Sequence, residues 1–162
     1  MLFRSDVVEV TLALAREMLA LVDVDTDPAV VLAGGEPREV FERMVAAQGG
    51  DLSAGLPVAG YRQEIVAPTT GYLGQLDCRA VGVAAWRLGA GRARKEDPVS
   101  ATAGVVCLSK PGDQVEAGQP LLELHSDDEG RFTSAVAALD GAIEVVDKAP
   151  ELPPLLIDRI AR

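Results

Sequence analysis

Histidine, aromatic side chains and long apolar runs are scarce in this sequence. Its 162 residues contain one histidine and 4% aromatic residues. No apolar run approaches the roughly 18 residues that a membrane-spanning helix requires, and the first residues lead directly into an acidic amphipathic pattern. We therefore expect neither a membrane span nor a signal peptide. Any histidine that serves as an acid or base must be His125.

Basic residues are also in the minority. Fifteen lysines and arginines stand against 25 aspartates and glutamates, which gives a formal net charge of -10. A surface of this charge repels nucleic-acid backbones and anionic membranes, so neither is expected as a partner. A local basic patch can still bind one anion. The 48% hydrophobic and 25% charged residues are typical of a folded globular protein.

The two cysteines, Cys78 and Cys107, lie in different apolar segments and lack the spacing of metal ligands. We interpret both as free, buried thiols of a protein in the reducing cytoplasm. Because no ligand cluster is evident elsewhere in the sequence, we expect no metal site.

Residues 1–50 are predicted to form three helices. Each predicted start combines a capping residue or a proline with an apolar periodicity. The starts are Ser5–Asp6, Asp27–Pro28 and Pro37. The second helix is expected to stop at Gly34–Gly35 and the third at Gly49. These helices carry more apolar surface than so short a segment can bury, which predicts a partner surface outside it.

Residues 51–60 lack periodicity and are interpreted as a linker. From Tyr61 the apolar period changes to two. Strands are expected at 61–68, 72–78, 103–109, 119–126 and 142–147, and helices at 79–91, with Asp77 as the cap, and at 128–140. This mixed order indicates an α+β domain over residues 61–162. Three prolines in residues 149–162 predict an extended tail.

Two segments of this domain, VAPTTGYLGQL and KPGDQVEAGQPLLEL, resemble the half-motifs of biotinyl and lipoyl domains. That resemblance implies a barrel-sandwich of two hammerhead hairpins, whose tight turns need glycine. A carrier domain also presents a lysine on an exposed hairpin. The nearby lysines, Lys95 and Lys110, lack the Met-Lys-Met or Asp-Lys-Ala setting, so the scaffold is favoured over the carrier function.

His125 ends a predicted strand and precedes Ser126, Asp127 and Asp128. A histidine beside carboxylates can form an acid–base pair or contribute to a metal site. Acidic residues at these positions are also typical of the first turn of a helix, where they interact favourably with the helix dipole. Because no second ligand cluster is evident, we favour a structural role for His125.

The segment AAWRLGAGRARKEDPV places three cations directly after two glycines. Arg92, Arg94 and Lys95, together with glycine amides, have the composition of a phosphate cradle. However, the glycines follow a predicted helix and do not precede one. The favoured interpretation is a helix stop at Gly89 or Gly91, with Arg92 and Arg94 facing the negative end of the helix.

A longer ordered string carries a more specific resemblance. AAWRLGAGRARKEDPVSATAGVVCLSKPGDQVEAGQPLLELHSDDEGRF is similar to the C-terminal domain of the thymidine phosphorylase / pyrimidine-nucleoside phosphorylase family. The residues that carry it are LGAGR-x-RKEDPV, GD-x-V-x-x-GQPL and LH before an acidic turn. VVEVTLALAREML and VFERMVAAQGGD resemble the helices that close that family's α/β domain, so the likeness covers nearly the whole chain after Ser5.

The resemblance implies a cytoplasmic, homodimeric pentosyltransferase of pyrimidine salvage, which converts a pyrimidine nucleoside and phosphate into free base and pentose 1-phosphate. Phosphate is a co-substrate, and no cofactor is implied. The family's Lys-His-Ser/Thr-Gly-Gly phosphate loop and its base-binding residues lie in the N-terminal two-thirds, and they do not occur in this chain. No catalytic residue of the family is therefore assigned here.

The implied role of this portion is scaffolding and closure of the substrate cleft, without activity on its own. Arg92, Arg94 and Lys95 form the candidate cleft-closure loop, acting through salt bridges or a long-range field on phosphate. The implied partner is the N-terminal part of the same enzyme. Two alternatives stay open: a biotinyl- or lipoyl-like module, and a structural domain that pairs with a separate catalytic subunit.

Overall fold

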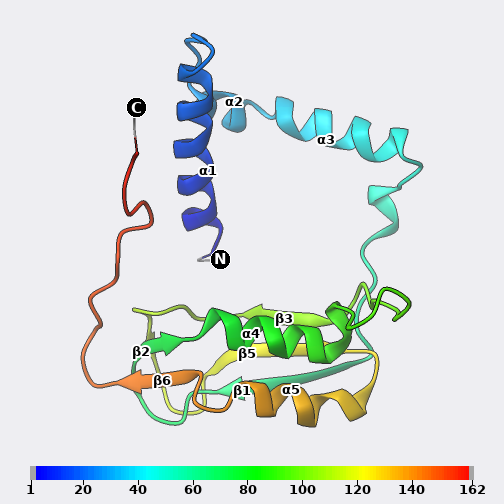
Figure 1. Ribbon diagram of the computed structural model, residues 1–162, viewed down its shortest axis with the longest axis vertical. Coiled ribbons are helices and arrows are strands. Elements are labelled where there is room, and N and C mark those ends of the chain that lie inside the picture. Colours follow the sequence, from blue (N-terminus) through cyan, green and yellow to red (C-terminus); the bar gives the residue numbers. More distant parts are fainter. Residues whose placement is uncertain (1–2, 161–162) are drawn as a thin grey trace. The chain divides into compact units, whose positions relative to one another are not determined.

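The computed structural model describes residues 3–160, which divide into two compact units. The helical unit comprises the described residues of Met1–Leu56 and Pro154–Arg162, and the sheet unit comprises Pro57–Pro153. Figure 1 shows the elements of both units along the chain. No helix in the described part of the chain combines the length and apolarity that crossing a membrane requires.

The helical unit contains α1 (Phe3–Ala20), α2 (Pro28–Gly34), α3 (Glu36–Ala47) and the short turn η1 (Leu52–Ala54). The predicted start of α2 is confirmed, because the Asp27 side chain accepts the Ala29 amide and Pro28 takes the first helical turn. Gly35, with φ of 89°, ends this helix as predicted.

The predicted start of α1 at Asp6 is wrong, because the helix already includes Phe3. None of residues 3–5 is a proline or glycine, so nothing in them stops the helix from extending past the expected Ser5 cap. Asp6 still lies in the first turn, where a carboxylate interacts favourably with the helix dipole.

The side chains of the helical unit remain largely uncovered. Neither α2 nor α3 has a buried residue, and large apolar side chains on all three helices are exposed. Examples are Leu14, Met18, Val30 and Phe41. An apolar face that a segment leaves uncovered is typical of a surface that packs against another body.

The sheet unit holds two antiparallel three-stranded sheets, which confirms the α+β prediction. One has the order β1 (Tyr61–Val66), β5 (Pro120–Ser126), β3 (Gly104–Cys107); the other has the order β4 (Gln114–Val115), β2 (Gly71–Leu76), β6 (Ile143–Val146). The strand β4 was not predicted, since a strand of two residues is too short to show an apolar period.

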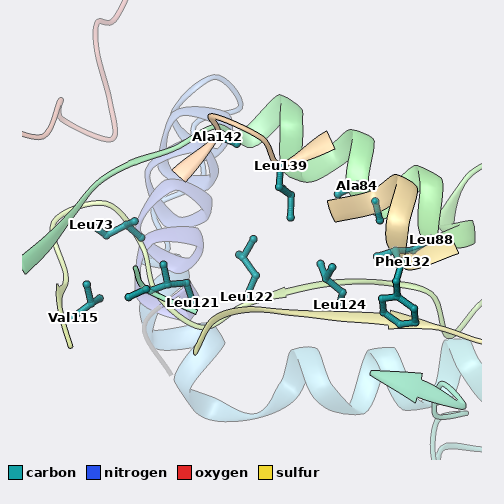
Figure 2. Packing of buried hydrophobic residues seen from close by; sticks show 12 residues of the cluster. Leu73, Ala84, Leu88, Val115, Leu121, Leu122, Leu124, Phe132, Leu139 and Ala142 are labelled. Atoms are coloured by element: carbon teal, nitrogen blue, oxygen red, sulfur yellow. The ribbon is translucent and has the colours of Figure 1, made fainter. Parts of the chain in front are cut away.

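Helices α4 (Cys78–Ala85) and α5 (Phe132–Ala138), with the turns η2 (Trp86–Ala90) and η3 (Glu129–Arg131), pack beside the β1-β5-β3 sheet. Leu122 and Leu124 point from β5 towards these helices, which supply Ala84 and Phe132 to the same cluster (Figure 2). Leu73 and Val115 extend the cluster into the second sheet. The hydrophobic core of the described chain therefore lies in the sheet unit.

Both cysteines are free, as predicted, but the expected burial is wrong for Cys78, which is exposed. Cys78 is the first residue of α4, directly after its cap, whereas the residue of this helix that is buried is Ala84. Burial raises the pKa of the half-buried Cys107 thiol. Residues 147–160 contain no helix or strand, in agreement with the predicted tail.

Candidate functional site

The basic loop, residues 91–99, follows the end of α4 and the turn η2. Asp77 caps α4, since its Oδ1 accepts the Ala80 amide at 2.9 Å. The helical path stops at Gly89, whose φ of 116° lies in the range that favours glycine. Of the two glycines predicted as the stop, Gly89 is the one that the chain uses.

Two serines satisfy the last carbonyls of this helix. The Ser100 amide donates to the Gly89 carbonyl at 2.9 Å, and the buried Ser126 hydroxyl donates to the Leu88 carbonyl at 2.8 Å. The first bond joins the two ends of the basic loop, so the loop is closed at a neck. The second ties that neck to β5 and the core.

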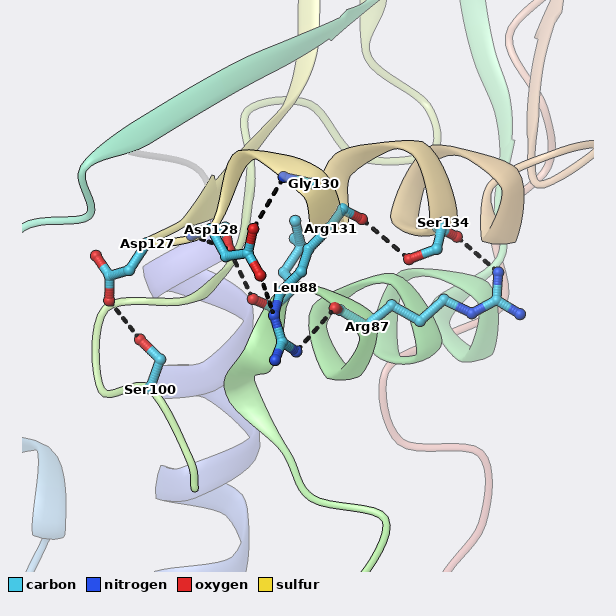
Figure 3. A network of polar contacts seen from close by, with 9 residues as sticks. Arg87, Leu88, Ser100, Asp127, Asp128, Gly130, Arg131 and Ser134 are labelled. Carbon is cyan, nitrogen blue, oxygen red and sulfur yellow. Dashed lines mark hydrogen bonds and ion pairs between the residues drawn. The ribbon is translucent and has the colours of Figure 1, made fainter. Parts of the chain in front are cut away.

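The predicted place of Arg92 and Arg94 at the helix end is wrong. The guanidinium that reaches this end belongs to Arg131, whose Nη1 donates to the Arg87 carbonyl at 3.4 Å (Figure 3). Arg92 instead donates from Nη1 to the Lys95 carbonyl, 3.2 Å away within the loop. The turn η3, which carries Arg131, packs beside η2 and so brings its side chain to the helix end.

The three cations predicted as one group do not converge. Arg94 Nε lies 3.8 Å from Asp97 Oδ1, and Lys95 Nζ lies 3.9 Å from Glu96 Oε1. The Arg94 and Lys95 side chains are 83% and 89% exposed, and ion pairs at this exposure contribute little to stability. Arg92 differs, because it lines a pocket under the loop.

Asp127 anchors the neck of the basic loop. Its carboxylate accepts hydrogen bonds from the Ser100 hydroxyl at 2.8 Å, from the Thr102 hydroxyl, and from the Gly60 amide at 3.1 Å. The Thr102 hydroxyl, then the Ser100 hydroxyl and the Gly60 amide, lower the pKa of Asp127 below its ordinary value. Asp127 is therefore a charged acceptor that joins the loop to the segment before β1.

The next acid, Asp128, begins a helical turn, as an acidic helix start predicts. Its Oδ1 accepts the Gly130 amide at 3.0 Å, which caps η3, and its Oδ2 lies 3.4 Å from Arg131 Nε (Figure 3). Asp128 thereby holds Arg131 in place beside the end of α4.

His125 does not pair with Asp127 or Asp128. Its Nε2 lies 2.5 Å from Glu123 Oε1, in a contact that lacks hydrogen-bond geometry, and Glu123 also lies 3.6 Å from Arg62. Side chains alternate along a strand, so His125 shares its sheet face with Glu123. Among residues 3–160, no three histidine, cysteine or acidic side chains are grouped as a metal ion requires.

A pocket of about 340 Å³ lies between the basic loop, η2 and the start of α5. We call it the loop pocket. Its lining includes Trp86, Arg87, Arg92, Asp97 and Arg131. The sequence did not indicate Arg87 and Arg131 as residues of this site, because no local sequence pattern connects them to Arg92. Only the packing of α4 against α5 brings them together.

The portion of the chain that holds this pocket also matches a family of known proteins. Residues 72–146 match the family model described as the pyrimidine nucleoside phosphorylase C-terminal domain. Two curated relatives, both named thymidine phosphorylase, come from Mycobacterium tuberculosis strains CDC 1551 / Oshkosh and ATCC 25618 / H37Rv. Each is 46% identical over 156 residues.

The matched region covers 96% of this chain but 36% of each relative. The chain therefore spans little more than a third of the length of the curated relatives that it matches. The domain match includes β4, β6, all of β2 except Gly71, both helices of the sheet unit and the whole basic loop. Residues 72–146 are therefore identified as a pyrimidine nucleoside phosphorylase C-terminal domain, and the chain as a whole is similar to the C-terminal part of thymidine phosphorylases.

Proposed function

We propose that this chain is the C-terminal part of a pyrimidine-nucleoside phosphorylase. The complete enzyme reversibly converts a pyrimidine nucleoside, such as thymidine, and phosphate into free base and pentose 1-phosphate. The observation that carries the proposal is the 46% identity over 156 residues to relatives named thymidine phosphorylase. In this proposal the three helices are the last elements of the enzyme's α/β domain. The hairpins of the sheet unit form a hammerhead barrel-sandwich.

The proposed contribution of this portion is scaffolding and closure of the substrate cleft. Ser126 and Asp127 fix the neck of the basic loop to the end of β5, whereas Arg94 and Lys95 extend into solvent. A loop with a fixed base and exposed cations suits the rim of a cleft that binds phosphate. Cleavage of a nucleoside benefits when closure excludes water and holds phosphate close to the sugar.

The proposed partner is the N-terminal part of the same enzyme, within a cytoplasmic homodimer. The exposed apolar side chains of α1, α2 and α3 support this partner, since they are available for packing. The family's phosphate-binding loop belongs to that part, so this chain alone is expected to be inactive. The carrier alternative gains no support, because Lys95 lies in the loop that follows the helical turn η2 and Lys110 is half-buried at the start of a tight turn.

A fusion tests the proposal. The chain is joined to the N-terminal portion of M. tuberculosis thymidine phosphorylase that it does not match, and release of thymine from thymidine and phosphate is measured. We expect phosphorolysis by the fusion and none by the N-terminal portion alone. A soluble, folded fusion that releases no base would overturn the proposal.

A further inference from the structure

The loop pocket gathers positive charge from three separate segments of an acidic protein. Arg87 comes from η2, Arg92 from the basic loop and Arg131 from η3, and all three line one pocket of about 340 Å³. The chain as a whole carries a net charge of -10, so three arginines in the lining of one pocket are not a consequence of its composition.

Two of these guanidinium groups are held in place. Arg87 Nη1 donates to the Ser134 carbonyl at 2.6 Å, and Arg131 Nη1 donates to the Arg87 carbonyl at 3.4 Å (Figure 3). Asp128 adds an ion pair to Arg131 at 3.4 Å. These contacts occupy one or two of the five N–H donors of each guanidinium, so further donors remain in fixed positions. Fixed donors lose little conformational entropy when a ligand binds.

The charge of the pocket is not balanced by its own lining. Asp97 is the acid that lines the pocket from the loop, and its partner is Arg94. Three guanidinium groups against this one carboxylate leave an excess of two positive charges. Asp128 offsets part of that excess from behind Arg131. A dianion is the ligand that relieves the mutual repulsion of the guanidinium groups.

The remaining wall is aromatic. Trp86 lines the pocket and is 44% exposed. Gly91 passes directly against the indole, since a Cβ at this position would lie 2.7 Å from Trp86 Cδ1. The glycine therefore allows the loop to run along the ring, beside the cations. A guanidinium group can donate two parallel hydrogen bonds to the oxygens of a phosphate. The indole provides an apolar surface next to these groups.

We propose that the loop pocket binds a phosphate dianion, free or as a monoester, through Arg87, Arg92 and Arg131. This site is a property of the chain itself and is separate from the phosphate-binding loop that the family resemblance places in the N-terminal part. Arg92 is the member of the set that the basic loop supplies, so a bound ligand links this loop to η2 and η3. The inference goes beyond the proposed function, because it does not require catalysis.

The single tryptophan makes the test direct. Trp86 is the only tryptophan in the chain, so its fluorescence reports on the pocket. Inorganic phosphate is titrated into the full chain at constant ionic strength, and ribose 5-phosphate is titrated in a second series. We expect a saturable change in at least one series. Tighter binding of ribose 5-phosphate assigns the site to monoesters, and tighter binding of inorganic phosphate assigns it to the free ion.

A matched pair of variants controls for nonspecific charge effects. Arg92→Gln and Arg94→Gln each remove one cation from the same loop, but only Arg92 lines the pocket. Loss of a charge-assisted hydrogen bond is expected to weaken binding by about tenfold in R92Q. R94Q is expected to bind within about twofold of the unaltered chain, as exposed charges interact weakly.

A third variant, Asp97→Asn, removes the pocket carboxylate and is expected to tighten binding by about threefold. A gain of affinity cannot result from a folding defect. Two results would overturn the inference. One is equal weakening in R92Q and R94Q, which indicates a diffuse field. The other is no saturable fluorescence change together with no shift of the Gly91 amide signal in the NMR spectrum.

Discussion

Asp127 joins segments that are far apart in the sequence. Its carboxylate accepts the Ser100 and Thr102 hydroxyls at the neck of the basic loop and the Gly60 amide just before β1. No residue of the basic loop itself is buried, so the placement of the loop depends on polar contacts at its neck. One ionised side chain therefore supports both the loop and the start of the sheet unit.

This carboxylate predicts a pH dependence. Hydrogen bonds from Thr102, Ser100 and Gly60 lower the pKa of Asp127 in the folded state below the ordinary 3.8. A lowered folded-state pKa contributes stability above the unfolded-state pKa, and this contribution is lost as the pH falls through the folded-state pKa. The unfolding free energy of the unaltered chain is therefore expected to fall more steeply than that of Asp127→Asn as the pH decreases from about 5 to below 3.8.

Urea unfolding at several pH values measures this difference. Asp27 and Asp51 also have lowered pKa values, but both residues are present in both proteins. Their effects cancel in the comparison, so the difference isolates Asp127. Parallel pH profiles would show that Asp127 does not act as a charged anchor.

At the scale of elements, the end of α4 is the feature on which the site depends. The turn η2 leads to Gly89, and the buried Ser126 hydroxyl donates to the Leu88 carbonyl at 2.8 Å. Replacing Ser126 by alanine leaves a buried carbonyl without this donor. We expect Ser126→Ala to lower the unfolding free energy by about 1–3 kcal/mol.

Ser134→Ala is the matched control for this prediction. The Ser134 hydroxyl donates to the Arg131 carbonyl at 3.0 Å, but the residue is exposed, so water can replace the bond. Its effect on the unfolding free energy is expected to stay within about 0.5 kcal/mol. Equal effects of the two substitutions in chemical denaturation would argue against a buried cap at Leu88.

The same helix marks the limit of prediction from sequence. Its cap at Asp77 and its stop at Gly89 were predictable, because capping side chains and positive φ angles are local properties. The partners of its last carbonyls were not, since Ser126 and Arg131 come from segments that only folding brings near. Arg92 was correctly singled out as part of a charged loop, but it was grouped with Arg94 and Lys95 instead of Arg87 and Arg131.

At the scale of the whole molecule, the two units differ in how much of their apolar surface is buried. The sheet unit contains the buried cluster that includes Leu122 and Leu124, whereas α2 and α3 have no buried residue. The surplus of apolar surface in residues 1–50 was predictable from composition and periodicity. What covers it was not, because the chain spans 36% of the length of its curated relatives.

The central claim is that this portion supports phosphorolysis without performing it. The most direct measurement is release of thymine by the purified chain incubated with thymidine and phosphate, next to its fusion with the N-terminal portion of the M. tuberculosis enzyme. We predict base release by the fusion and none by the chain alone. Phosphate-dependent release of thymine by the chain alone would contradict the account.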